Sequence, residues 1–231
     1  MTVGTKSILF GAHQFAIHPW FVARAWWRLY GFPWDPRLWV AFAVHDLGYW
    51  GSPNMDGPEG ELHVEWGANL MNALFDRAPD RTCAVCWGNV WYQPEGGGWV
   101  ATCGRCYARA FRWRDLCLYH SRFYAKRDGK PFSRLCVADK LAVALTPAWL
   151  YLPLVRLTGE AREYMTRDSR QDSKNWTPER SDDRVWFART QAWCRAWAVE
   201  HRDGRDDTWT PPPLVGGARG GKTDRLNGGA R

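Results

Sequence analysis

The chain has 231 residues, enough for one well-packed core and a small additional module. Hydrophobic residues make up 45% and charged residues 24%, as in an ordinary globular protein. The net charge of +7 fits an anionic partner without identifying one, because part of the excess lies in the C-terminal tail. The sequence contains no long apolar run and no signal-peptide pattern, so we expect a cytoplasmic protein without membrane contact.

Most of the chain has the apolar spacing of α-helices. Residues 7–76 contain three such segments, which read "HPWFVARAWWRLYG", "RLWVAFAVHDLGYW" and "ELHVEWGANLMNALFD". The pattern returns in "FRWRDLCLYHSRFYAKR" and "PFSRLCVADKLAVALT" and continues past Pro147 to about Met165. One more amphipathic segment, "DDRVWFARTQAWCRAWAVEH", follows a polar stretch at 167–182.

Residues 80–109 differ from the helical segments on either side. Short β-like runs at Val90–Tyr92 and Trp99–Ala101 flank the turn sequence "QPEGGG". Four cysteines form two CxxC pairs with 16 residues between them: Cys83 and Cys86, then Cys103 and Cys106. Two such turns complete a tetrahedral Zn²⁺ site, and four thiolates leave no open position for catalysis. We therefore expect a zinc ribbon with one structural Zn²⁺.

Histidine and aspartate suggest a second metal centre. His18 begins a predicted helix, His45 and Asp46 end the next, and Asp139 lies in a helix otherwise rich in Leu, Val and Ala. A buried carboxylate without a partner is costly, so one metal ion would explain both acids. His63 lies near the start of a third helix, and we expect His120 in the middle of another.

We expect two further histidines to lie outside the ligand set. His13 lies five residues before His18, about 140° around a helix, so it is expected beside the metal. His201 precedes the tail and is expected at the surface.

The order His…His-Asp…Asp, in the contexts "HPWFVARAWWRLYG", "AVHDLGY" and "VADKLA", resembles the HD-domain superfamily of metal-dependent phosphohydrolases. The resemblance covers about 7–76 and 110–165. It implies an all-α helical bundle, here with the small β-hairpin zinc ribbon inserted. It also implies a first divalent metal held by four residues: His18, His45, Asp46 and Asp139. His63 and His120 resemble the additional ligands of a second metal, which Asp46 would bridge.

The resemblance further implies hydrolysis of a phosphate ester or anhydride, most plausibly of a nucleotide, by metal-activated hydroxide. The catalytic cations would be Mn, Fe, Co, Mg, Ni or Zn. Some nucleotide-hydrolysing relatives place a Glu where this chain has Tyr49. The candidate replacements as general acid or base are Asp56, Glu59, Glu61 and Glu65, and we nominate Glu61.

A group of cations follows His120: Arg122, Lys126, Lys130 and Arg134. Arg122 and Lys126 are four residues apart, so one helix face could present both to a phosphate. A solvated basic face is the alternative. Lys140, next to Asp139, could reach the site or extend to solvent.

The expected organisation has five parts. Two parts of an HD-domain bundle, at 1–79 and 110–166, flank the zinc ribbon at 80–109. A C-terminal helical extension at 167–202 precedes a Gly, Pro and Arg-rich tail at 203–231, which is expected to be disordered.

Two other functions stay open at this point. The protein could be a phosphodiesterase for a cyclic nucleotide or an oligonucleotide. It could instead be a non-catalytic binding protein with a vestigial HD site, contacting nucleic acid through the tail or through the basic ribbon with Arg105 and Arg109.

Overall fold

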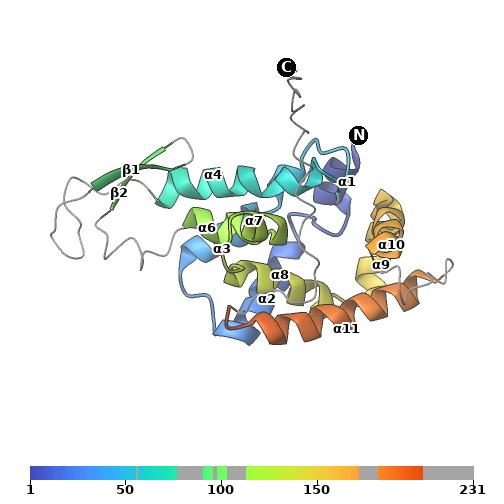
Figure 1. Ribbon diagram of the computed structural model, residues 1–231. Coiled ribbons are helices and arrows are strands. Elements are labelled where there is room, and N and C mark those ends of the chain that lie inside the picture. Colours follow the sequence, from blue (N-terminus) through green and yellow to red (C-terminus); the bar gives the residue numbers. More distant parts are fainter. Residues whose placement is uncertain (56, 77–90, 96–97, 103–112, 172–181, 205–231) are drawn as a thin grey trace, which may run out of the picture.

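The computed structural model describes residues 1–55, 57–76, 91–95, 98–102, 113–171 and 182–204, and this part of the chain is mostly helical (Figure 1). The α-helices are α1 (Val3–Phe10), α2 (His18–Tyr30), α3 (Pro36–Val44), α4 (His63–Phe75), α6 (Trp113–Leu118), α7 (Arg122–Arg127), α8 (Arg134–Leu145), α9 (Ala148–Thr158), α10 (Glu160–Gln171) and α11 (Asp183–His201). The shorter elements are the 3₁₀ turns η1 (Leu47–Tyr49) and η2 (Gly60–Leu62) and the strands β1 (Trp91–Glu95) and β2 (Gly98–Thr102).

The strands pair antiparallel, with Trp91 opposite Thr102 and Glu95 opposite Gly98. The four CxxC cysteines, Asp56 and residues 205–231 lie outside the described part. The zinc ribbon and its Zn²⁺ therefore stay predictions, as does the disordered tail.

Local sequence signals set the helix boundaries near the site. Pro19 lies in the first turn of α2, and Gly31 ends that helix at φ +90°, a conformation that glycine adopts without strain. The side chain of Asp35 accepts a hydrogen bond from the Arg37 N–H at the start of α3. Ser133 caps α8 in the same way through the Cys136 N–H. These caps fix where the His and Asp residues fall.

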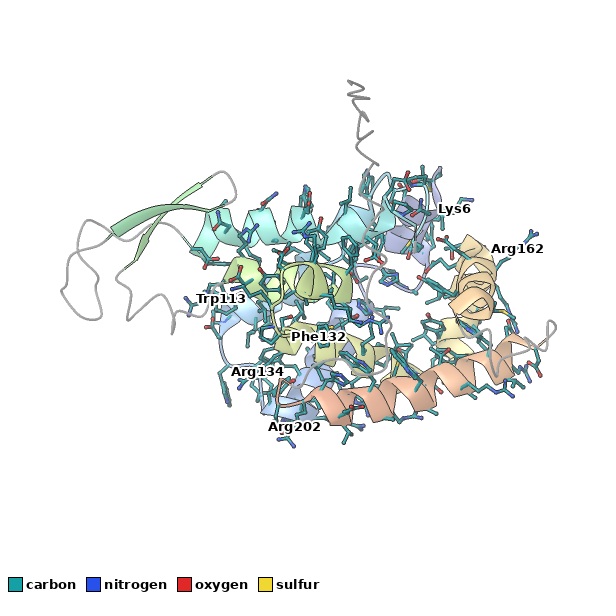
Figure 2. All side chains as sticks on the ribbon, viewed as in Figure 1. Lys6, Trp113, Phe132, Arg134, Arg162 and Arg202 are labelled. Carbon is teal, nitrogen blue, oxygen red and sulfur yellow. The ribbon has the colours of Figure 1, made fainter. Side chains whose placement is uncertain are left out.

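The principal core lies among α2, α3, α4, α6, α7, α8 and α11, and α8 packs against both α2 and α11. Figure 2 shows side chains filling the space between these helices, with Phe132 among them and Arg162 and Arg202 at the surface. Cys117, Cys136 and Cys194 are buried and pack as small core residues.

Two glycines let α4 approach the end of α3 closely. A Cβ at Gly48 would lie 1.9 Å from the backbone oxygen of His63, and a Cβ at Gly67 would lie 2.7 Å from that of Val44. Both contacts are with backbone, which cannot move aside as a flexible side chain could. The absence of side chains at these positions therefore brings the start of α4 against the His45–Asp46 segment.

The expected helix around His120 is broken. α6 ends at Leu118 and α7 begins at Arg122, because the Ser121 hydroxyl accepts hydrogen bonds from the Phe123 and Tyr124 N–H groups. The expectation that His120 lies in the middle of a helix was wrong, since the residue lies in the turn between the two.

None of the described helices alone is long and apolar enough to cross a membrane. α8 and α9 reach that length and composition only together, and they are bent by 102° at the break between them.

Candidate metal centre

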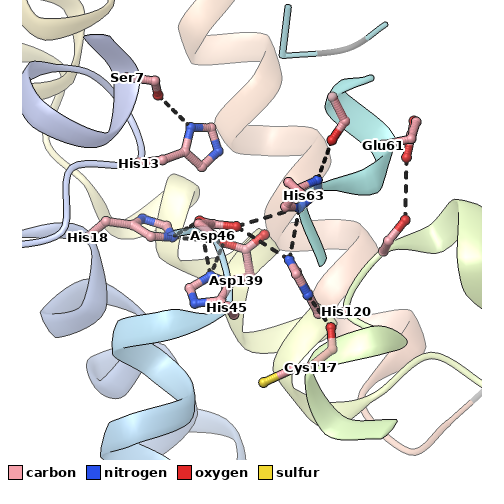
Figure 3. Close-up of polar contacts among 12 residues, drawn as sticks. Ser7, His13, His18, His45, Asp46, Glu61, His63, Cys117, His120 and Asp139 are labelled. Atoms are coloured by element: carbon pink, nitrogen blue, oxygen red, sulfur yellow. Dashed lines mark hydrogen bonds and ion pairs between the residues drawn. The ribbon is translucent and has the colours of Figure 1, made fainter. Parts of the chain in front are cut away.

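Six buried side chains meet between the helices (Figure 3). α2 begins with His18, α3 is followed by His45 and Asp46, and α4 begins with His63. The turn between α6 and α7 supplies His120, and α8 supplies Asp139. Three helix ends, one turn and one helix interior thus converge on a single point.

The first set of donors is the group His18, His45, Asp46 and Asp139, whose ligand atoms all lie within 4.8 Å of one another. His18 Nε2 is 3.3 Å from Asp46 Oδ2 and 3.1 Å from Asp139 Oδ1. His45 Nε2 is 3.1 Å from Asp46 Oδ2. Two donors at right angles on one cation, each about 2.1 Å from it, are about 3 Å apart, so this spacing fits a shared ion.

The second set is Asp46, His63 and His120. His63 Nε2 lies 3.6 Å and His120 Nε2 lies 3.4 Å from the other carboxylate oxygen of Asp46, Oδ1. Asp46 therefore faces one group of donors with Oδ2 and the other with Oδ1. This is the arrangement of a carboxylate that bridges two cations.

Main-chain carbonyls orient three of the histidines. Nδ1 lies 3.0 Å from the Phe42 oxygen in His45, 2.5 Å from that of Gly60 in His63, and 2.5 Å from that of Cys117 in His120. A carbonyl only accepts, so each Nδ1 carries the hydrogen and, in the neutral ring, Nε2 carries the lone pair. The same second bond commonly fixes the tautomer of metal-binding histidines.

Several atoms of the cluster are buried without a hydrogen bond: His18 Nε2, His45 Nε2 and Asp46 Oδ2. Buried polar atoms are nearly always paired, because a missing partner costs about 1–3 kcal/mol. All three point into the first donor set. The buried His/Asp group could therefore hold a metal ion, and its imidazole and carboxylate donors suit a divalent one.

Burial and charge act in opposite directions on these groups. Burial lowers the pKa of His45, but Asp46 and Asp139 outweigh it and raise the pKa to about 10. Burial raises the pKa of Asp46, but His45 and other histidines hold it well below its ordinary value. Burial lowers the pKa of His63 to about 3, with a contribution from His120, so this ring is neutral and can offer its lone pair. The carboxylates are ionised and need cationic partners.

Tyr49 covers the second donor set. Its ring stacks on that of His63 with centroids 3.9 Å apart and planes 7° from parallel. Tyr49 occupies the position where the resemblance leads one to look for a Glu. In place of a carboxylate, Tyr49 supplies an aromatic ring that packs flat against the His63 imidazole.

A third buried acid, Glu160, supports the site from outside. Glu160 is fully buried and accepts hydrogen bonds from the Thr158 hydroxyl at 2.6 Å and from the Ala12 N–H at 3.3 Å. Its carboxylate lies 3.7 Å from Nδ1 of His13, whose ring packs against His18. His13 is thus beside the cluster, as expected from its spacing. The importance of Glu160 was missed, because nothing in its local sequence distinguishes it from a surface acid.

The other nominated residues differ in their distance from the cluster. Lys140 donates to Asp139 Oδ2 at 3.3 Å, so it reaches the site, although its side chain stays partly exposed. Arg122 lies near enough to influence the pKa of Lys140, and its guanidinium lies 5.3 Å from the centre of the Trp193 ring. Lys126 is half-buried on α7.

Among the candidate acids, Glu61 accepts a hydrogen bond from the hydroxyl of Ser121, the residue after His120, at 3.4 Å. Glu59 is bound by the Asn54 amide, and Glu65 accepts from the Tyr124 hydroxyl. Of the acids that the structure describes, Glu61 has the contact nearest to the second donor set.

The expectation that His201 is exposed was wrong. The ring is fully buried and stacks on Trp197 at 4.1 Å, with Phe132 against it. The packing of α11 on α8 covers a residue that the adjoining polar tail suggested would face solvent.

No family model matches the chain, and neither the curated proteins nor the solved structures compared with it give a match. The chain is a mostly helical protein with a buried His/Asp cluster that could hold metal, compatible with an HD-like site.

Proposed function

We propose that the protein is an HD-type, metal-dependent phosphohydrolase that cleaves a phosphate ester or anhydride of a nucleotide. The observation that carries the proposal is the position of Asp46, whose two carboxylate oxygens face two separate sets of donors. A structural metal site needs one closed set of ligands. Two sets sharing a carboxylate are typical of sites that act on phosphate.

His18, His45, Asp46 and Asp139 would hold the first cation. Asp46, His63 and His120 would hold the second, with three protein donors, one fewer than a closed tetrahedral site has. When bound, such a pair of divalent cations lowers the pKa of water and neutralises charge on a phosphoryl group.

The chain's own residues then hold and orient the substrate. Lys140 neutralises the outer oxygen of Asp139, which keeps that carboxylate turned toward the histidines. Arg122, which lies near enough to Lys140 to influence its pKa, and Lys126 are the candidates to bind phosphate oxygens, and we expect Arg122 to contribute more. Glu61, beside the turn that carries His120, is the candidate to accept or donate the proton. The stacked ring of Tyr49 restricts His63.

Turnover tests the proposal directly. The full chain, loaded with Mn²⁺, is assayed against nucleoside mono-, di- and triphosphates, a cyclic nucleotide, and the mono- and bis-nitrophenyl phosphates. Asp46→Asn should abolish turnover. Asp35→Asn is the matched control, because Asn also caps a helix and Asp35 lies outside the cluster. Equal turnover by wild type and Asp46→Asn would overturn the mechanism.

The same assay separates the alternatives. Turnover confined to the cyclic nucleotide or the bis-ester would make the protein a phosphodiesterase. Tight Mn²⁺ binding without turnover of any substrate would favour a binding protein with a vestigial site. The presence of all six donor side chains opposes that second outcome.

A further inference from the structure

A hollow lies on the outer face of α2 and the loop that follows it. It has a volume of about 670 Å³ and an open mouth. Its walls are mainly aromatic with two cations, and the side chains that matter here are Trp20, Arg24, Trp27, Arg28, Phe32 and Trp39. A soluble protein rarely exposes this much aromatic surface in one place without a partner.

The rings form two braced walls. Trp20 and Trp39 meet edge to face with centroids 5.5 Å apart, and Trp27 and Phe32 do so at 5.6 Å. The indole N–H of Trp39 donates to the Pro33 carbonyl at 2.9 Å, which fixes one wall. Trp20 remains 65% and Trp27 59% exposed, so their faces are available to a ligand.

The charge of the hollow is positive. Arg24 and Arg28 lie one helical turn apart on α2, both exposed, and no acidic side chain lines the hollow. Within the residues that the structure describes, neither guanidinium makes an ion pair or a hydrogen bond. Both are available to an anion, and both line the same hollow as the aromatic rings.

This hollow is separate from the metal centre. The buried face of α2 carries His18, Val22 and Leu29, whereas Arg24 and Trp27 lie on its exposed face. With 3.6 residues per turn, these positions fall about 180° to 240° around the helix from His18. A ligand in the hollow would leave the donor sets unaltered.

We propose that this aromatic hollow binds single-stranded nucleic acid, with bases stacked on the tryptophans and phosphates held by Arg24 and Arg28. Stacking platforms beside cations are the common means of binding single strands without sequence preference. A membrane surface would be met by side chains projecting from a convex face, whereas these rings enclose a hollow. The site is distinct from the ribbon and the tail considered above.

Fluorescence anisotropy with a short fluorescein-labelled oligothymidylate tests the proposal on the full chain. No divalent cation is added, and the length of the probe is checked on a gel afterwards, so the result does not depend on turnover. Trp27→Ala should raise the Kd about tenfold. Arg24→Gln with Arg28→Gln should reduce the magnitude of the salt slope by about 1.4, because each phosphate contact on a single strand contributes about 0.7.

Matched controls lie on other helices. Trp149, on α9, is 76% exposed, and Arg189, on α11, is exposed. Trp149→Ala and Arg189→Gln should bind as wild type. All altered side chains are exposed, so every variant should unfold at about the same temperature as wild type.

Two results would overturn the proposal. Unchanged binding by both the Trp27→Ala and the double arginine variant would place any nucleic-acid contact elsewhere on the chain. Absence of oligonucleotide binding by wild type would exclude nucleic acid as the occupant. If wild type then bound vesicles of anionic lipid, and Trp27→Ala weakened that binding, the hollow would be a membrane contact instead. Neither result bears on the metal centre, whose test is turnover by the Asp46 variants.

Discussion

The Nε2 atoms of His63 and His120 face each other across 3.2 Å, while the Nδ1 atom of each ring lies 2.5 Å from a main-chain carbonyl. If both carbonyl bonds are kept, the two neutral rings turn lone pairs toward each other. Two lone pairs at this distance repel unless a proton or a metal ion lies between them. Burial and His120 lower the pKa of His63 to about 3, which disfavours a proton on the His63 ring. The pair is therefore best explained as two ligands of one cation.

Replacing His120 should remove one of the two cluster cations and leave the other. His120 belongs to the second donor set; its ring also meets that of His45, but His120→Gln keeps all four donor side chains of the first set. Elemental analysis after Mn²⁺ loading and desalting should show one cation fewer per chain than wild type. His201→Gln, which removes a buried histidine outside the cluster, should keep the wild-type count. Loss of both cations in His120→Gln would show that the sets are not separable.

Tyr49 should matter through its ring rather than its hydroxyl. The stacking on His63 holds the imidazole in place, and groups that orient a ligand typically contribute tenfold or more to metal affinity. In a titration with Mn²⁺, we expect Tyr49→Ala to raise the Kd for the second cation about tenfold. Tyr49→Phe should bind this cation as wild type does. Equal weakening in both variants would assign the effect to the hydroxyl instead.

Arg122→Gln should impair turnover more than Lys126→Gln. Arg122 lies near enough to Lys140 to influence its pKa, and Lys140 donates to Asp139 in the first donor set. Loss of one charged hydrogen bond to phosphate corresponds to about a 10- to 100-fold fall in kcat/KM. The comparison is made on whichever substrate wild type turns over. A larger loss in Lys126→Gln would reverse the assignment.

Gly48→Ala should destabilise the protein by about 1–3 kcal/mol, because the new methyl group would meet the backbone of His63. The temperature of thermal unfolding and the metal content should both fall, because the close packing of α4 also positions His63 in the site. Asn69→Ala, at an exposed position of α4, is the control and should unfold at or slightly above the wild-type temperature. A Gly48→Ala protein of wild-type stability would mean that α4 need not approach so closely.

The contribution of Glu160 should depend on pH. Burial raises its pKa, but His13, Thr158 and Ser7 outweigh burial and lower it. A carboxyl whose folded pKa is lowered adds stability above its unfolded pKa, and this stability is lost as the pH falls through the folded value. At a pH near 7, Glu160→Gln should thus unfold at a lower temperature than wild type.

The groups that face Glu160 come from four places: Ser7 on α1, Ala12 and His13 in the loop before α2, Thr158 at the end of α9, and Tyr164 on α10. The difference in unfolding temperature between Glu160→Gln and wild type should shrink as the pH falls below about 4.5. A difference that grows toward acid would contradict the assigned direction.

The sequence contained enough to predict the helical class and much of the candidate site. Pro19 and Gly31 mark the ends of α2, and the His45–Asp46 doublet ends α3 where the apolar pattern stops. These are local signals, because caps and periodicity act within one helix. That the six ligand candidates converge is a tertiary fact. It was inferred from the resemblance, not from spacing.

The predictions failed for side chains whose burial is decided by tertiary packing. His201 is buried because α11 lies on α8, and Glu160 is buried because the Ala12 and His13 loop covers it. Neither partner is near in sequence. The break at His120 was different, since Ser121 is a good helix cap and the signal was present but outweighed by the apolar pattern on both sides.

Metal content per chain, measured for wild type and Asp46→Ala after Mn²⁺ loading and desalting, tests the central claim most directly. Asp46 contributes an oxygen to each donor set, so its removal should affect both. The account predicts two cations in wild type beyond any zinc held by the cysteines, and neither in Asp46→Ala. Equal metal content in the two proteins would contradict it.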